Sequence, residues 1–222
     1  MNYVNPLTIM LGVLVYTDFY PYLCSVMKYV LDIEFEKYYQ SVYLRWRIKA
    51  EKAGKDIVGE EYEKFRQNFY KSFGLIVEDE HDVFGSGVNP DNVIKKDGKI
   101  IIIEEDKGSY VDGTFLKRAL VDAATIFDTC ITNEIECPYF ILSCVTTMKN
   151  YQQIYDKVTS LFNNNLKNVL NEKFLYLPLS ESGRVSQTKY FKTEKNHFTL
   201  SEKLIDEQNK KINEIIEKYN GI

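Results

Sequence analysis

The sequence predicts an α/β fold in which helices flank a central β-sheet. Apolar runs at 100–103 and 139–145 are typical of buried strands, and helices are expected at 60–73 and 114–129. The chain has 222 residues, of which 45% are hydrophobic and 27% are charged. This composition is typical of a globular protein, and without internal repeats or low-complexity linkers we expect one domain spanning 1–222.

The central elements are expected in the order helix, strand, strand, strand, helix, strand. Their expected bounds are 60–73, 75–77, 92–95, 99–106, 114–129 and 139–145. Gly74 stops the first helix, and Thr114 is expected to cap the second. The Asp97-Gly98 pair between two apolar strands indicates a tight hairpin.

Further elements are expected on both sides of this core. They are helices at 33–53, 151–170 and 201–219 and a short strand at 174–179. The apolar stretch 6–31 is interrupted by Asp18, Pro21 and Lys28, which favours a buried helix or a dimer interface over a membrane span. The four cysteines form no CxxC pair, which indicates reduced thiols in a cytoplasmic protein and no zinc site.

Two short motifs on neighbouring strands carry the chemistry of this chain. Pro90-Asp91 precedes the first strand of the hairpin, and Glu105-Asp106-Lys107 follows the apolar run of the second. Residues two apart in a strand share a face, so Glu105 and Lys107 point one way and Asp106 the other. Two carboxylates and an ammonium group arranged in this way are suited to hold a divalent metal ion and a water molecule.

This spacing resembles the PD-(D/E)XK nuclease superfamily, whose best-known members are type II restriction endonucleases. The expected order of elements is similar to the core of that superfamily, and the resemblance covers about 60–147. It implies an αβββαβ catalytic core with a central mixed sheet, to which N- and C-terminal helices are added.

The resemblance also implies a role for each residue of the site. Asp91 and Glu105 are expected to bind Mg²⁺, together with the backbone carbonyl of Asp106. Lys107 is expected to orient the attacking water and to stabilise negative charge near the phosphate. Family members often recruit a further acid from the preceding helix. The expected acid is Glu61, with Glu60 and Glu63 as close alternatives.

The sequence leaves the register of the hairpin open. A plain two-residue turn at 97–98 would pair Asp91 with Glu104. Opposed residues share a face, so Asp91 would then lie on the opposite face from Glu105. A one-residue bulge, or a bend before Asp91, corrects this, and bulges are frequent beside active sites. We expect the bulge; without it Glu104 would be the ligand and Lys107 would lose its role.

The function predicted from these motifs is that of a Mg²⁺-dependent, site-specific double-stranded DNA endonuclease similar to a type II restriction enzyme. Cutting both strands of a palindrome calls for a two-fold homodimer. Two segments carry the basic and hydrogen-bonding groups that DNA binding requires. The DNA-binding candidates in these segments are Arg45, Arg47, Arg184, Gln187, Lys189 and Lys192.

The overall charge leaves alternatives open. A net charge of −4, from 28 basic and 32 acidic residues, counts mildly against DNA binding. Acids gathered around a metal site can produce this total while a local face stays basic. The alternatives are a repair, phage or transposon nuclease of the same superfamily, and a non-catalytic module that binds DNA or protein.

Overall fold

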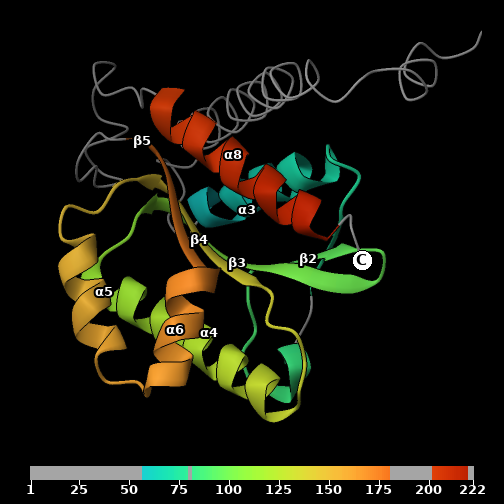
Figure 1. Cartoon of the computed structure of the whole chain (residues 1–222). Coiled ribbons are helices and arrows are strands. Elements are labelled where there is room, and N and C mark those ends of the chain that lie inside the picture. Colours follow the sequence, from blue (N-terminus) through green and yellow to red (C-terminus); the bar gives the residue numbers. More distant parts are fainter. Residues whose placement is uncertain (1–56, 80–81, 181–201, 220–222) are drawn as a thin grey trace, which may run out of the picture.

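The computed structural model describes residues 57–79, 82–180 and 202–219. In these residues a five-stranded sheet lies between two layers of helices (Figure 1). The helices are α3 (Ile57–Lys71), the 3₁₀ helix η1 (Val83–Gly85), α4 (Gly113–Thr132), α5 (Tyr151–Thr159), α6 (Asn164–Lys173) and α8 (Glu202–Lys218). The strands are β1 (Ile76–Glu78), β2 (Asn92–Lys96), β3 (Lys99–Tyr110), β4 (Tyr139–Thr146) and β5 (Phe174–Ser180).

The sheet is mixed, as the sequence predicts. Its strands lie in the order β1-β2-β3-β4-β5, in which the first three are antiparallel and the last three are parallel. A tight turn suffices between antiparallel β2 and β3, whereas parallel β4 requires a crossover, which α4 provides. From α3 to β4 the elements follow the expected order, with only η1 added between β1 and β2. The predicted α/β class, with helices flanking a mixed sheet, is therefore confirmed.

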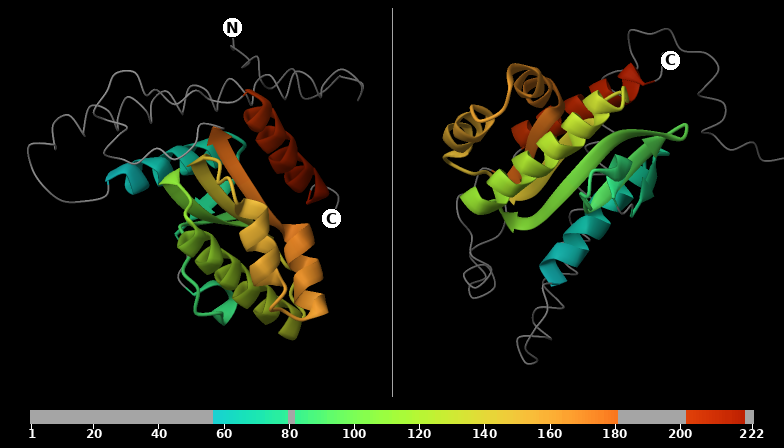
Figure 2. Two further views of the ribbon diagram at one scale, coloured as in Figure 1. Left: turned by 90° about the vertical axis from the view of Figure 1, so that its left-hand side faces the viewer. Right: turned by 90° about the horizontal axis from the view of Figure 1, so that it is seen from below.

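Each face of the sheet is covered by its own helices (Figure 2). Helices α3 and α8 pack on one face, where Phe69 and Ile212 contact a cluster that includes Ile102. Helices α4, α5 and α6 pack on the other face, where Phe127 belongs to a cluster that includes Ile103. Because successive side chains of a strand point to opposite faces, the apolar run of β3 supplies both cores.

A β-bulge in the hairpin changes which residues of β2 and β3 face each other. Asp97 and Gly98 turn the chain with φ values of 49° and 79°, as a two-residue turn of type I′ requires. Near the turn Lys95 pairs with Ile100, but beyond it Ile94 pairs with Ile102, so the register moves by one residue. Asn92 consequently pairs with Glu104, and the same register places Asp91 opposite Glu105. The predicted bulge is confirmed.

The prediction of a single helix over 151–170 is wrong, because the structure has two helices there. Helix α5 ends at Thr159, and α6 begins at Asn164 after a short turn. The Asn163 side chain accepts a hydrogen bond of 2.9 Å from the backbone N–H of Leu166, which is the arrangement of a helix N-cap. A second helix start inside the expected range therefore divides it, with Leu161 left 81% exposed at the break.

The predicted N-cap of the helix that connects β3 to β4 is wrong by two residues. Asp112, not Thr114, is the N-cap of α4. Its Oδ1 accepts hydrogen bonds from the backbone N–H groups of Thr114 at 2.9 Å and Phe115 at 2.8 Å. Aspartate is favoured here because it satisfies two free N–H groups and places negative charge at the positive end of the helix.

Replacing Asp112 with alanine should therefore lower the free energy of unfolding by about 1 kcal/mol, the usual contribution of an N-cap side chain. Urea unfolding at neutral pH measures this change. Thr114→Ala is the matched control and should be close to neutral. An equal loss for the two variants would contradict the assignment of the cap.

Several sequence predictions lie outside the described residues. These are the apolar stretch 6–31, the helix at 33–53 and the first residue of the helix expected at 201–219. The described helices are not long and apolar enough to cross a membrane.

Candidate active site

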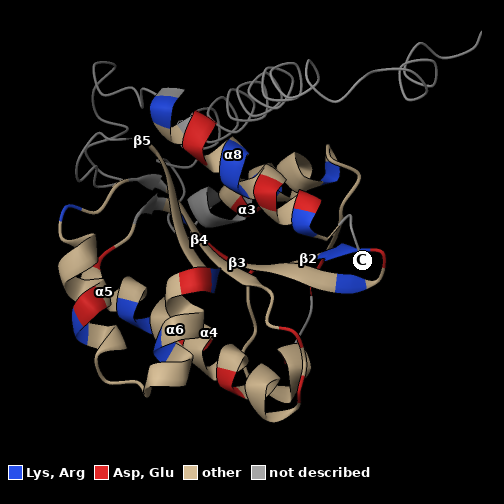
Figure 3. Cartoon of the chain, viewed as in Figure 1, with Lys and Arg blue, Asp and Glu red and all other residues tan. Residues whose placement is uncertain are grey.

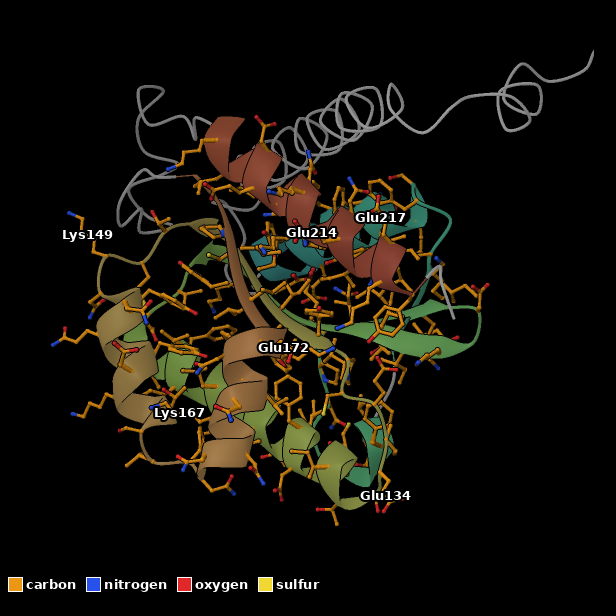
Figure 4. All side chains as sticks on the ribbon, in the orientation of Figure 1. Glu134, Lys149, Lys167, Glu172, Glu214 and Glu217 are labelled. Atoms are coloured by element: carbon orange, nitrogen blue, oxygen red, sulfur yellow. The ribbon has the colours of Figure 1, made fainter. Side chains whose placement is uncertain are left out.

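Three consecutive acids in β3 are buried in the sheet, unlike many charged side chains of this protein. Acids and bases alternate along α8 at the surface (Figure 3), and the exposed side chains of Glu134 and Lys149 point away from the protein (Figure 4). Glu104, Glu105 and Asp106 are each exposed by 8% or less. Burying a carboxylate is costly unless it is paired, hydrogen-bonded or protonated, so we expect each of the three to have a partner or a raised pKa.

The side chains of Glu104 and Glu105 point to opposite faces of the sheet. Glu104 faces α3, where Arg66 donates hydrogen bonds of 2.7 Å from Nε and 2.9 Å from Nη2 to its two oxygens. The hydroxyl of Tyr70 donates a further bond to Glu104, and Gln208 of α8 accepts from Arg66. Glu104 is thus fully satisfied on that face, whereas Glu105 faces α4.

Asp91 and Glu105 form an acid pair at the start of β2 and the middle of β3. The bulge places them opposite each other, and the backbone N–H of Asp106 donates a 2.7 Å hydrogen bond to Oδ2 of Asp91. Glu105 is only 3% exposed, and Asp91 is half-buried. The two carboxylates predicted to act together therefore lie on the same side of the hairpin.

Burial and mutual repulsion make the charged form of this pair unfavourable. Burial raises the pKa of Glu105 to about 8, and the Asp91 charge adds to that effect while Arg118 opposes it. Burial also raises the pKa of Asp91, against the hydrogen bond from Asp106. Carboxylates held in this way gain from any nearby positive charge, whether a proton or a cation.

Asp106 points to the other face, as strand alternation predicts. Its Oδ2 accepts a 2.7 Å hydrogen bond from Nδ2 of Asn92. Burial, followed by the Glu104 charge, raises the pKa of Asp106 well above its usual range. Its side chain thus belongs to the α3 side of the sheet, and only its backbone adjoins Asp91.

Lys107 lies two residues beyond Glu105 on the same strand. Its half-buried side chain carries the ammonium to 4.8 Å from the centre of the Phe115 ring in α4. The Lys107 charge lowers the pKa of Asp91, although less than burial raises it. Two acids and one lysine therefore share a region on the α4 side of the sheet.

Sequence reasoning missed three residues of α4 in this region. Nη2 of Arg118 lies 3.7 Å from Oε2 of Glu105, and its Nε lies 3.5 Å from Oδ2 of Asp122. Phe115 sits one turn earlier, with its ring centre 5.6 Å from Cζ of Arg118. The Arg118-to-Asp122 spacing on the helix that follows the motif was the one available signal.

The remaining predicted site residues are the helix acid and the DNA-binding side chains. Glu60 and Glu61 belong to α3, but their side chains lie outside the description. The charge of Glu63, the third candidate, makes a small contribution to the raised pKa of Glu105. The predicted DNA-binding residues also lie outside the described ranges; they are Arg45, Arg47, Arg184, Gln187, Lys189 and Lys192. Among the described side chains, no three His, Cys, Asp or Glu residues are grouped closely enough to hold a metal ion.

Comparison of the chain with protein-family models, curated proteins and solved structures gives no match. Carboxylate oxygens are the donors that Mg²⁺ prefers, and the neighbouring ammonium can stabilise an anion or orient a water molecule.

Proposed function

We propose that this protein is a Mg²⁺-dependent DNA endonuclease of the PD-(D/E)XK kind. The observation that carries the proposal is the register of the hairpin. The bulge sets Asp91 opposite Glu105, and Lys107 shares the face of Glu105. The order of elements and the antiparallel-then-parallel sheet support the same conclusion, because they match the αβββαβ core that the resemblance implies.

The donor set suits Mg²⁺. Asp91 and Glu105 supply hard oxygen donors, and their raised pKa values indicate that a divalent cation would relieve an unfavourable local charge. The backbone carbonyl of Asp106 is the proposed third donor, and Glu61 the proposed helix acid. When bound, Mg²⁺ would supply charge stabilisation at the phosphate and make a bound water more acidic.

The protein side chains would then position the reacting groups. Lys107 is proposed to orient the attacking water and to stabilise negative charge on the phosphate. The Phe115 ring, 4.8 Å from its ammonium, limits the positions that this side chain can take. The hydrogen bond from the N–H of Asp106 fixes one oxygen of Asp91. These contacts hold the acid pair and the lysine in place before the substrate arrives.

The proposed substrate is double-stranded DNA, cut at a specific sequence by a homodimer in the cytoplasm. Each protomer would contribute one site, so that a two-fold axis relates the two cuts. Repair, phage or transposon nucleases would use the same site chemistry with recognition of DNA structure. The distribution of cuts on long DNA separates these roles.

Replacing Lys107 with alanine should slow cleavage by roughly a thousandfold, as expected for loss of a single preorganised charged group in an active site. Purified wild type and Lys107→Ala are incubated with long linear phage DNA, with Mg²⁺ or with EDTA. We expect discrete fragments from the wild type with Mg²⁺ alone. Thermal unfolding of both proteins checks that the variant is folded.

The other outcomes of this experiment are equally informative. A smear from the wild type would retain the nuclease and exclude the restriction-type role. Equal cleavage by Lys107→Ala would remove Lys107 from the mechanism. Intact DNA throughout, on duplex and on single strands, would contradict the proposal and favour a non-catalytic binding module.

A further inference from the structure

The two arginines that pair with the neighbouring acids of β3 are held very differently. Arg66 is fully buried and contacts both oxygens of Glu104 within 2.9 Å. Arg118 is 65% exposed, and its distance to Glu105 is 3.7 Å. That distance is longer than the 2.7–2.9 Å of a charge-assisted hydrogen bond. Arg66 is therefore a fixed structural partner, whereas Arg118 is free to exchange its acid for another anion.

Arg118 places an exposed guanidinium next to the buried Glu105 carboxylate. Glu105 is 3% exposed, and the guanidinium that approaches it is largely in solvent. The Nε of Arg118 contacts Asp122 at 3.5 Å, and Phe115 lies beside it one turn earlier. The guanidinium nearest to Glu105 is thus accessible to a ligand from solvent and has two further contacts on its own helix.

The charges of this region favour an anion once the acids are neutralised. When ionised, Asp91, Glu105 and Asp122 contribute three negative charges, and Lys107 and Arg118 contribute two positive charges. A divalent cation on the acid pair would make the region net positive. It would also weaken the attraction between Glu105 and Arg118 and release the guanidinium, whose planar donors match the oxygens of a phosphate group.

We infer that Arg118 binds a backbone phosphate of the DNA, next to the phosphate held at the acid pair, and that Asp122 positions its guanidinium. This inference rests on the proposed nuclease function and adds a specific contact to it. The Phe115 ring lies 4.8 Å from the Lys107 ammonium and 5.6 Å from Cζ of Arg118, so both cations belong to the same region. Arg118 would thus set the register of the backbone relative to the metal site, without reading its sequence.

The test measures DNA binding with Ca²⁺ in place of Mg²⁺, over a series of salt concentrations, for wild type and Arg118→Ala. The DNA is a short duplex containing a cleavage site mapped beforehand with the wild-type protein and Mg²⁺. Loss of a charge-assisted phosphate contact should weaken binding about tenfold and reduce the slope of log K against log salt by about one. Arg118→Lys, which keeps the charge, should restore the slope and part of the affinity. Lys117→Ala, at the exposed neighbouring position, is the matched control and should change neither.

A second measurement identifies the phosphate. Single uncharged methylphosphonates are placed at successive positions of the same duplex. We expect one position near the cleavage site to weaken binding by the wild type but not by Arg118→Ala, because the contact is already lost in the variant.

Failure of this inference is distinct from failure of the proposed function. If the wild type cuts DNA and Arg118→Ala binds with unchanged affinity and slope, the contact does not exist. An equal effect of Lys117→Ala would show a general electrostatic field and would also overturn the assignment. A wild type that neither cuts nor binds DNA would remove the nuclease function itself.

Discussion

Glu105→Gln should abolish Mg²⁺-dependent cleavage and, at the same time, stabilise the metal-free protein above pH 8. The substitution keeps the shape of the side chain and removes its charge. Glu105 is 3% exposed beside Asp91, so its carboxylate has little water to solvate it and a like charge nearby. A ligand lost from the proposed metal site removes catalysis, whereas a buried charge lost from the fold removes an energetic cost.

The sign of the pH dependence follows from the raised pKa. The pKa of Glu105 is about 8 in the folded protein, against an ordinary value of 4.5. Between these values the folded protein holds a proton that the unfolded chain releases, so the stability of the wild type falls as the pH rises. The advantage of Glu105→Gln should therefore be absent below pH 4.5 and should grow up to about pH 8. We expect it to reach roughly 2 to 4 kcal/mol, below the full value for such a shift because the buried amide also lacks a close partner.

Urea unfolding in EDTA at pH 5, 7 and 9 measures this trend, and single-turnover cleavage with Mg²⁺ measures activity. Glu104→Gln is the matched control, since it makes the same change one residue earlier on the opposite face. It should lose stability, because Arg66 would keep its buried charge without a charged partner. If Glu104→Gln lost DNA cleavage while Glu105→Gln cleaved DNA normally, the register that places Glu105 in the site would be contradicted.

Arg66→Met should destabilise the protein by about 3 to 5 kcal/mol, the usual cost of removing one partner from a buried ion pair. Arg66 and Glu104 are both fully buried, and Tyr70 and Gln208 complete their hydrogen bonds. Methionine fills much of the same volume but leaves the Glu104 carboxylate without its main partner. The pair joins α3 to β3, and Gln208 extends the connection to α8.

A double-mutant cycle separates the charge from the packing. Arg66→Met combined with Glu104→Leu removes both charges, and such replacements of a buried pair are often close to neutral. We therefore expect the double variant to regain most of the stability that Arg66→Met loses. Urea unfolding of the four proteins of the cycle tests this, and a double variant no more stable than Arg66→Met would show that the ion pair is not the source of the loss.

The sequence was sufficient to predict the strands that carry the site, but it left their register open. The apolar run before Glu105 and the Asp97-Gly98 turn identify the hairpin, because both signals are local. A plain turn would have set Asp91 against Glu104, and the bulge was preferred because the resemblance to the PD-(D/E)XK superfamily fits Glu105. Strand geometry therefore showed that a plain turn and a bulge give different partners for Asp91, and the structure has the bulged register.

Other features depend on contacts between distant parts of the chain, which a single sequence does not reveal. Arg66 and Glu104 are 38 residues apart, and Arg66 and Gln208 are 142 apart. Their pairing depends on how α3 and α8 cross the sheet. The approach of Arg118 to Glu105 likewise depends on how α4 packs against β3. The break between α5 and α6 was missed because helical residues lie on both sides of the Asn163 cap.

Measurement of metal binding shows whether Asp91 and Glu105 form a divalent-metal site. Titration of Mn²⁺, followed by the electron paramagnetic resonance signal of the free ion, is carried out with wild type, Asp91→Asn and Glu105→Gln. Each protein is measured alone and with duplex DNA, because a phosphate oxygen can complete the coordination of the ion. We expect the wild type to bind Mn²⁺ in competition with Mg²⁺ and each substitution to remove this binding. Equal binding by all three proteins, or no binding by the wild type under either condition, would contradict the proposed metal site.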